Sequence, residues 1–129
     1  MAKVEHINSH WAKLPFDEQA LRSTASRFIE GHMHTMLVSD GGYFAGLMQP
    51  VAFASNQFLA LEYAWFAQDG NGLALLAAFE RWAENMGAVA VVVGDHGRGG
   101  RLRKALEGRR KYEMVGSVMA KKMEVPVWQ

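Results

Sequence analysis

Residues 59 to 93 constrain the fold more than any other part of the chain, because strand-like and helix-like patterns follow one another there. Leu59 to Ala67 (LALEYAWFA) is rich in aromatic and aliphatic side chains, a composition that favours a β-strand. The turn-forming residues Gly70, Asn71 and Gly72 come directly after it. The chain is therefore expected to end a strand and change direction at this glycine turn.

The stretch from Gly72 to Met86 has the period of an amphipathic helix. Its apolar stripe consists of Leu75, Leu76, Phe79, Trp82, Ala83 and Met86. Gly87 is a natural helix end, and Ala88 to Val93 is then an unbroken apolar run. Continuous apolar residues are typical of a parallel strand that is buried on both faces. Residues 59 to 93 therefore predict a βαβ unit.

The N-terminal half predicts one helix and antiparallel strands. The expected elements are a short strand at residues 2–7, a helix from about 15 to 30, and strands at 34–39 and 43–54. The last two would form a hairpin around Asp40-Gly41-Gly42, since glycine accepts the positive φ that tight turns need. Pro50 marks a bulge or an edge in the returning strand.

The C-terminal part contains a concentration of positive charge. Between Arg98 and Lys111 there are seven basic residues and one acid, so this segment carries +6 and the rest of the chain −5. A short helix is expected at Arg101 to Glu107, and Tyr112 to Met123 predicts one or two final strands. With 129 residues the chain fits one domain (1–129) of mixed α/β class. We expect a mostly antiparallel sheet with one central parallel crossover and helices on both faces.

Composition excludes several classes of protein. Half of the residues are hydrophobic and 21% are charged, as in a globular protein. Cysteine is absent, which excludes disulfides and thiolate metal sites and fits a reducing compartment. The sequence begins with no apolar stretch of signal-peptide length and contains no run of about 18 apolar residues. We therefore expect a cytoplasmic protein that does not act at a membrane.

The glycine turn and its surroundings resemble the GNAT superfamily, the acyl-CoA-dependent N-acyltransferases, in element order over nearly the whole chain. The family's signature is Arg or Gln, two residues, Gly, one residue, then Gly or Ala, leading into a helix. Gly72 and Ala74 occupy the last two places, but Asp69 stands where the family has Arg or Gln. The turn is also a few residues shorter than usual. The chain resembles in particular the short members that bacteriophages encode.

The resemblance implies acetyl-CoA as co-substrate and an amine, on a small molecule or a protein, as acceptor. In the family, the pantetheine arm lies along the strand before the turn, and amides at the helix start bind the pyrophosphate. The residues at these positions are Trp65, Phe66 and Ala67 for the arm and Gly70, Asn71, Gly72, Leu73 and Ala74 for the pyrophosphate. Arg98 and Arg101 would contact the 3′-phosphate of the adenosine end.

Two residues are candidates for catalysis, because acyl transfer needs a base for the amine and an acid for the leaving thiolate. Glu62 is the candidate base, since burial in its apolar strand would make the carboxylate more basic. The family often has a carboxylate on this strand. Its Tyr acid would fall at about residues 106–108, where this chain has none. Tyr112 is the nearest phenol and the candidate acid, although it also fits a core aromatic.

Several alternatives remain open at the level of sequence. The segment 98–111 fits a solvated face, a coenzyme A contact or nucleic-acid binding, for which only Tyr112 offers a stacking platform. His32 and His34 would share one side of a strand, but no third ligand is close in sequence, so we expect no metal site.

The leading hypothesis is an N-acetyltransferase. The rival is a catalytically inactive GNAT-fold protein with a binding or virion-associated role, which Asp69 favours. The oligomeric state is open, with a homodimer as one candidate.

Overall fold

The computed structural model describes residues 14–68, 70–94, 101–108, 110–116 and 118–126. The strand predicted at residues 2–7 lies outside the described residues. The chain forms two compact units, Met1–Val93 and Gly94–Gln129. The single domain expected from the sequence stays a prediction.

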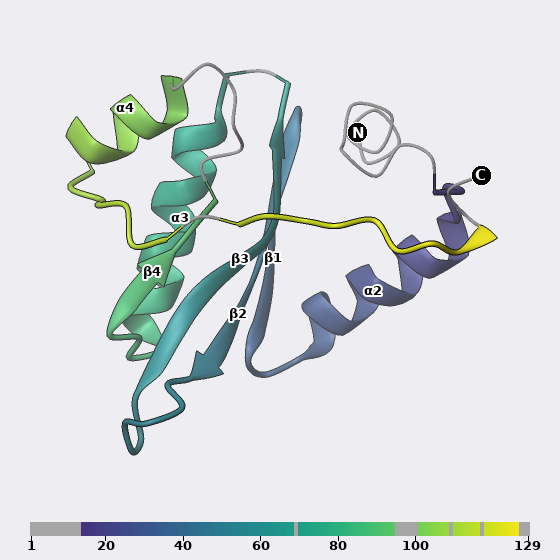
Figure 1. Cartoon of the computed structure of the whole chain (residues 1–129). Coiled ribbons are helices and arrows are strands. Elements are labelled where there is room, and N and C mark those ends of the chain that lie inside the picture. The colour runs from purple at the N-terminus through teal and green to yellow at the C-terminus, as the bar shows by residue number, and fades with distance from the viewer. Residues whose placement is uncertain (1–13, 69, 95–100, 109, 117, 127–129) are drawn as a thin grey trace. The chain divides into compact units, whose positions relative to one another are not determined.

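The described part of the first unit consists of four strands and two helices. In chain order these are α2 (Glu18–Glu30), β1 (His34–Ser39), β2 (Gly42–Pro50), β3 (Phe58–Ala67), α3 (Gly72–Asn85) and β4 (Ala90–Val92). The strands form one sheet in the order β1-β2-β3-β4, in which β3 and β4 are parallel and the other pairs antiparallel. Helices α2 and α3 lie on opposite faces of this sheet (Figure 1). The predicted fold class and the βαβ unit β3-α3-β4 are therefore confirmed.

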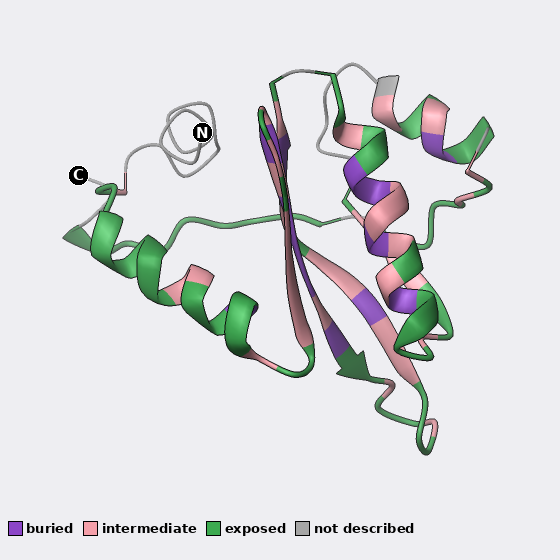
Figure 2. Ribbon diagram, turned by 180° about the vertical axis from the view of Figure 1, so that it is seen from behind, coloured by how far each residue is buried: buried purple, intermediate pink, exposed green. Residues whose placement is uncertain are grey.

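The core lies between α3 and the sheet, where the buried residues gather (Figure 2). Leu76 and Phe79 of α3 are fully buried, and the Phe79 ring stacks on that of Phe44 in β2 at a centroid distance of 4.3 Å. Leu75 and Ala83 are also buried, so these four residues of the predicted apolar stripe face the sheet, whereas Met86 lies after the helix end at Asn85 and is exposed. Burial of such side chains contributes about 1.5–3 kcal/mol each, which makes this layer the main source of stability.

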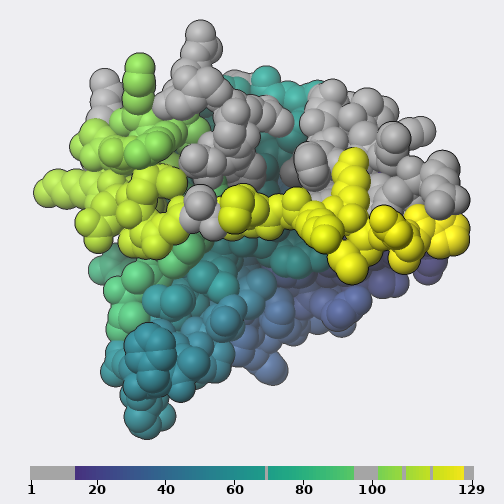
Figure 3. Space-filling view, in the orientation of Figure 1, coloured from purple at the N-terminus to yellow at the C-terminus, as the bar shows by residue number. Residues whose placement is uncertain are grey.

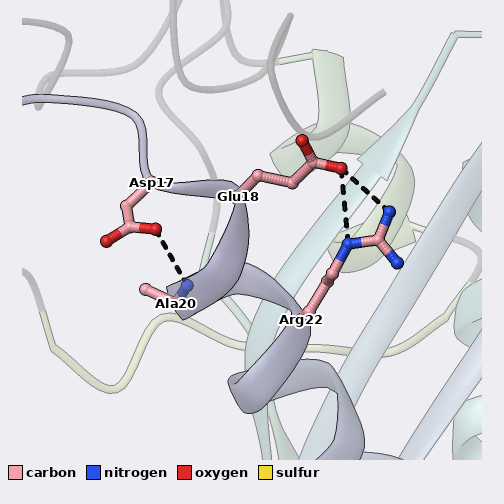
Figure 4. Close-up of polar contacts among 4 residues, drawn as sticks. All are labelled: Asp17, Glu18, Ala20 and Arg22. Atoms are coloured by element: carbon pink, nitrogen blue, oxygen red, sulfur yellow. Dashed lines mark hydrogen bonds and ion pairs between the residues drawn. The ribbon is translucent and has the colours of Figure 1, made fainter.

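Helix α2 covers the other face more loosely (Figure 2). It begins at a cap in which Oδ1 of Asp17 accepts a hydrogen bond from the amide of Ala20 at 3.1 Å (Figure 4). Phe28 is the one buried residue of the helix. Its ring contacts the rings of Tyr63 and His34 at centroid distances of 4.7 and 5.0 Å. The α2 side of the sheet is thus held mainly through one aromatic contact.

The predicted β1–β2 hairpin is present, but its turn has two residues, Asp40 and Gly41, because Gly42 already pairs with Ser39 as the first residue of β2. The expected reason for its glycines is wrong. Among the described glycines, only Gly70 and Gly87 have a positive φ. Gly42 is needed for space instead, since a Cβ there would lie 2.4 Å from the carbonyl oxygen of Phe66. Glycine at this position therefore lets β2 and the end of β3 approach closely.

Three predictions about strands are wrong. Strand β2 ends at Pro50, which lacks an amide hydrogen, and not at Ala54. Strand β4 has only three residues and Ala90 is exposed, because β4 is the edge of the described sheet and pairs with β3 alone. The described residues from 110 to 126 contain no strand. In the second unit the helix α4 (Arg101–Gly108), which the sequence predicts, is followed by described residues without a further α-helix or strand.

Candidate active site

The two parallel strands of the βαβ unit differ in length, and this opens one edge of β3. Their pairing runs from Leu59 opposite Ala90 to Leu61 opposite Val92 and then stops. Strand β3 continues to Ala67 and remains paired with β2 on its other side. In the described structure, no strand pairs with the β4 side of β3 beyond Leu61. An edge that lacks a neighbouring strand is where an extended ligand can pair with the backbone of a sheet.

A β-bulge lies where this open edge begins. Ala45 of β2 is opposite Ala64, but the next residue, Gly46, is opposite Glu62, so that Tyr63 is an extra residue in β3. A bulge bends its strand and increases the local twist. The sequence analysis missed this feature, because a bulge depends on the register between two strands. The one signal for it is Gly46 in the interior of a strand.

Gly46 is required at the bulge because the core leaves no room for a side chain. A Cβ built on Gly46 would lie 2.1 Å from Cε1 of Phe79. The fully buried Phe79 ring therefore rests against the backbone of β2 beside the bulge. This contact links the core directly to the position of Glu62 in β3.

Glu62, the candidate base, is the first residue after the last parallel pair. It is half-buried, and not buried as the sequence analysis expected. A carboxylate at this depth keeps contact with water and needs no buried counter-ion. Its place between the end of the parallel pairing and the bulge makes it the acidic side chain of β3 beside the open edge.

The candidate residues for the cofactor arm are the last three residues of β3, Trp65, Phe66 and Ala67. The side chains of Trp65 and Phe66 are only 8% and 7% exposed, and the Trp65 ring packs against Phe44 at 5.3 Å. These side chains therefore belong to the packing of the sheet. What Trp65, Phe66 and Ala67 offer to a ligand is their backbone.

The glycine turn leads directly into α3. Gly70 has a φ of +78°, which an L-residue rarely adopts. Asn71 precedes the helix and supplies no side-chain cap, and the first turn contains no acidic residue. Leu73 and Ala74 in that turn are exposed. The first amides of a helix have no partner within the helix and lie at the positive end of its dipole. Asp69 lies outside the described residues.

Gly72 has a different environment from the other glycines. A Cβ built there would lie 3.5 Å from Nε1 of Trp65 and 3.6 Å from Cβ of Ala67, which are ordinary van der Waals distances. Its φ is not in the left-handed region. The packing of the protein itself therefore does not require glycine at this position.

The remaining candidates belong to the second unit. Tyr112 is half-buried, and burial raises the pKa of its phenol above the ordinary value of 10.0, with Arg110 opposing the rise. Its amide donates a hydrogen bond to the carbonyl of Leu106 at 2.9 Å. Arg98 lies outside the described residues, and Arg101 is the first residue of α4.

The described residues show neither a metal site nor a membrane span. No three of their His, Asp and Glu side chains come together as metal ligands would. Nδ1 of His34 is buried without a hydrogen-bond partner in the described structure, and its ring contacts Phe28. None of the described helices is long and apolar enough to cross a bilayer.

Comparison by sequence finds no matching protein-family model and no matching curated protein. Comparison by structure finds clear similarities. A complex of the aminoglycoside N-acetyltransferase AAC(6')-Iy with a CoA bisubstrate analogue has a TM-score of 0.64 at 15% identity, over 93% of this chain and 92% of that chain. For an acetyltransferase from Trypanosoma brucei the TM-score is 0.65 at 11% identity, over 95% and 89% of the two chains.

A protein from Bacillus halodurans that is described as a transcriptional regulator is also similar, with a TM-score of 0.72 at 8% identity over 95% and 91% of the two chains. At such low identities, structural similarity shows the fold and not the activity. The chain therefore has the fold of the GNAT acetyltransferases, as the resemblance implied.

Proposed function

We propose that this protein is an N-acetyltransferase that transfers the acetyl group of acetyl-CoA to an amine. The observation that carries the proposal is the open edge of β3 beyond Leu61, which ends at the glycine turn and the start of α3. An extended pantetheine arm with its two amides can pair with such an edge as a strand would. The acetyltransferases with similar structures include one that binds CoA and a CoA analogue.

The start of α3 would hold the pyrophosphate. Its exposed first turn combines free amides with the positive end of the helix dipole, which favours an anion. Gly72 supports this assignment, because the fold tolerates a Cβ there and a ligand in contact with the backbone would not.

The chemistry would take place where the bulge meets the open edge. Glu62 would accept a proton from the acceptor amine as the amine nitrogen attacks the thioester carbonyl carbon. A backbone amide near Phe66 or Ala67 would donate a hydrogen bond to the developing oxyanion. The C–S bond then breaks, and the CoA thiolate takes up a proton. Tyr112 is the proposed donor, since a tyrosine phenol is protonated at neutral pH.

Calorimetric titration with acetyl-CoA tests the proposal. We expect saturable binding, and we expect release of free CoA thiol when an acceptor amine is added. A folded protein that gives no heat at millimolar acetyl-CoA would contradict the proposal. Glu62→Gln should keep the binding of acetyl-CoA and lower turnover by about 10²–10⁴-fold, which is the usual contribution of a general base.

Gly72→Ala separates a ligand role from a structural one. We expect the free energy of unfolding to stay the same or rise slightly, because alanine favours helix and its Cβ meets only ordinary contacts. Binding of CoA should weaken at least tenfold if the pyrophosphate lies against this backbone. A variant that binds CoA as tightly as the wild type would place the pyrophosphate elsewhere.

Asp69 favours a second candidate, a GNAT-fold binding protein without acetyltransferase activity. A carboxylate about 4 Å from pyrophosphate would cost on the order of 1–4 kcal/mol. We predict that Asp69→Arg tightens CoA binding at least fivefold, with Asp69→Asn between it and the wild type. If Asp69→Arg weakens binding, the carboxylate serves as a helix cap and does not repel the ligand.

A further inference from the structure

The C-terminal segment, which we define as residues 112–126, exposes an unusual amount of apolar surface. Its described residues form no strand and no α-helix, and residues 124–126 are a bend followed by a single 3-10 position. Its exposed large hydrophobic residues are Met114, Val115, Val118, Met119, Met123 and Val125. Val118 and Met119 are 99% and 93% exposed. The segment is the yellow part of the chain in Figure 3.

Such a segment calls for a partner on physical grounds. Contiguous apolar side chains in water are unfavourable and typically mark an interaction site. Valine, tyrosine and methionine along an extended backbone also suit pairing in a sheet, which satisfies the backbone amides and carbonyls. The segment therefore has the properties of a strand whose partner is absent from a single chain.

We propose that residues 112–122 pair antiparallel with the same residues of a second copy of this chain, about a twofold axis. Such an axis is perpendicular to the sheet and keeps each residue on the same face in both strands. Opposite residues must therefore have the same parity, because side chains alternate between faces. In any one register, the residue numbers of every opposite pair therefore have the same sum, and this sum is even.

The charges of the segment select one register. When opposite numbers add up to 234, Glu113 faces Lys121 of the second copy, and the symmetry repeats this ion pair. The same register sets Val115 against Met119, two of the most exposed apolar side chains. Cross-strand pairs of opposite charge and of apolar residues both stabilise a sheet.

The two neighbouring registers lack this match. A sum of 232 sets Lys111 against Lys121, which places like charges opposite each other. A sum of 236 sets Lys121 against Val115 and Glu113 against Met123, so that both charges face apolar side chains. The segment is thus complementary to itself in one register, as a homodimer requires.

The edge of a sheet within one chain is the alternative partner. Strands β1 and β4 are the two edges of the described sheet. Strand β4 provides only the three residues Ala90–Val92, β1 provides the six residues His34–Ser39, and neither contains an Asp, Glu, Lys or Arg. Residues 112–122 form a longer strand, and β4 offers nothing to Glu113 or Lys121 that would fix their register. A second copy satisfies both the length and the charges.

Charge reversal at the two ion-paired positions tests the proposal. The oligomeric state is measured by sedimentation equilibrium for the wild type, Glu113→Lys, Lys121→Glu and the double variant. We expect a wild-type dimer and, for each single variant, a dissociation constant at least about tenfold higher, because two attractive pairs become repulsive. The double variant exchanges the charges and should dimerise like the wild type.

A mixture of the two single variants gives the sharpest result. The lysine introduced at position 113 of one chain would face the glutamate introduced at position 121 of the other. Equal amounts of the two variants should therefore form a heterodimer although each alone is mostly monomeric. Lys122→Glu is the matched control, since it makes the same charge change next to Lys121 and removes no ion pair in this register.

Three outcomes would overturn the proposal. The first is a wild-type protein that stays monomeric up to high concentration, which would favour pairing within one chain. The second is a dimer whose dissociation constant is unaffected by either single reversal. The third is a mixture of variants that associates no better than its components. Circular dichroism of each variant establishes that the chain is folded, since both positions are exposed.

Discussion

At the scale of the residue, Gly46 is the point where core packing and the candidate site depend on each other. The Phe79 ring occupies the space that a Cβ would need, at 2.1 Å. We predict that Gly46→Ala lowers the free energy of unfolding by about 1–3 kcal/mol, because the ring or β2 must shift. Chemical denaturation measures this, with Gly108→Ala as control, where a Cβ meets nothing within 4 Å. An equal effect at both positions would show that the Phe79 contact is unimportant.

Tyr112 gives a pH-dependent prediction. Burial raises the pKa of its phenol in the folded state, so the unfolded chain ionises first as the pH rises. The stabilisation is complete below the unfolded pKa of about 10 and is lost as the pH rises toward the folded value. The free energy of unfolding of Tyr112→Phe should therefore fall less steeply above about pH 10 than that of the wild type. Equal slopes in urea unfolding would contradict the burial of the phenol.

At the scale of the element, the sequence predicts what short-range patterns decide. The apolar period of α3, the end of α2 at residue 30 and the presence of the β1–β2 hairpin all follow from local residue types. The bulge at Tyr63 and the early end of β4 pairing depend on how separate strands align, which no local pattern contains. The same limit applies to residues 112–123, whose strand-like composition predicts strands although a strand forms only with a partner.

In the candidate site, Glu62 and the glycine turn can be predicted from the sequence, but the open edge of β3 beside them cannot. The prediction that Glu62 is buried is also wrong, because strand composition does not tell which edge of β3 stays open. Half-burial follows from the end of the β4 pairing one residue earlier.

Helix α2 depends on its cap more than on its surface ion pair. Asp17 accepts a hydrogen bond from the amide of Ala20, whereas Glu18 and Arg22 form an exposed i,i+4 pair at 2.9 Å. We predict that Asp17→Ala costs about 0.5–2 kcal/mol. Arg22→Ala should cost at most about 0.5 kcal/mol. Thermal unfolding of the two variants compares the effects, and a larger loss for Arg22→Ala would reverse this ranking.

At the scale of the whole molecule, the fold alone leaves activity open. Structures of similar topology include acetyltransferases and a protein described as a transcriptional regulator. Function therefore depends on what the open edge of β3 and the glycine turn bind. The dimer proposed from residues 112–122 includes Tyr112, the proposed acid, but its charge pairs at Glu113 and Lys121 lie outside β3 and the start of α3 and can be tested separately.

A ligand that binds the folded protein raises its free energy of unfolding, which gives a final prediction. A ligand that binds only the folded state at a hundred times its dissociation constant raises the free energy of unfolding by about 2.7 kcal/mol. For a chain of 129 residues this corresponds to a rise in Tm of roughly 10 °C. Acetyl-CoA should produce this shift in the wild type and a clearly smaller one in Gly72→Ala at the same concentration. Adenosine, which lacks the pyrophosphate and the pantetheine arm, is the control ligand. If adenosine stabilises the protein as much as acetyl-CoA does, neither the open edge nor the helix start is the principal binding site.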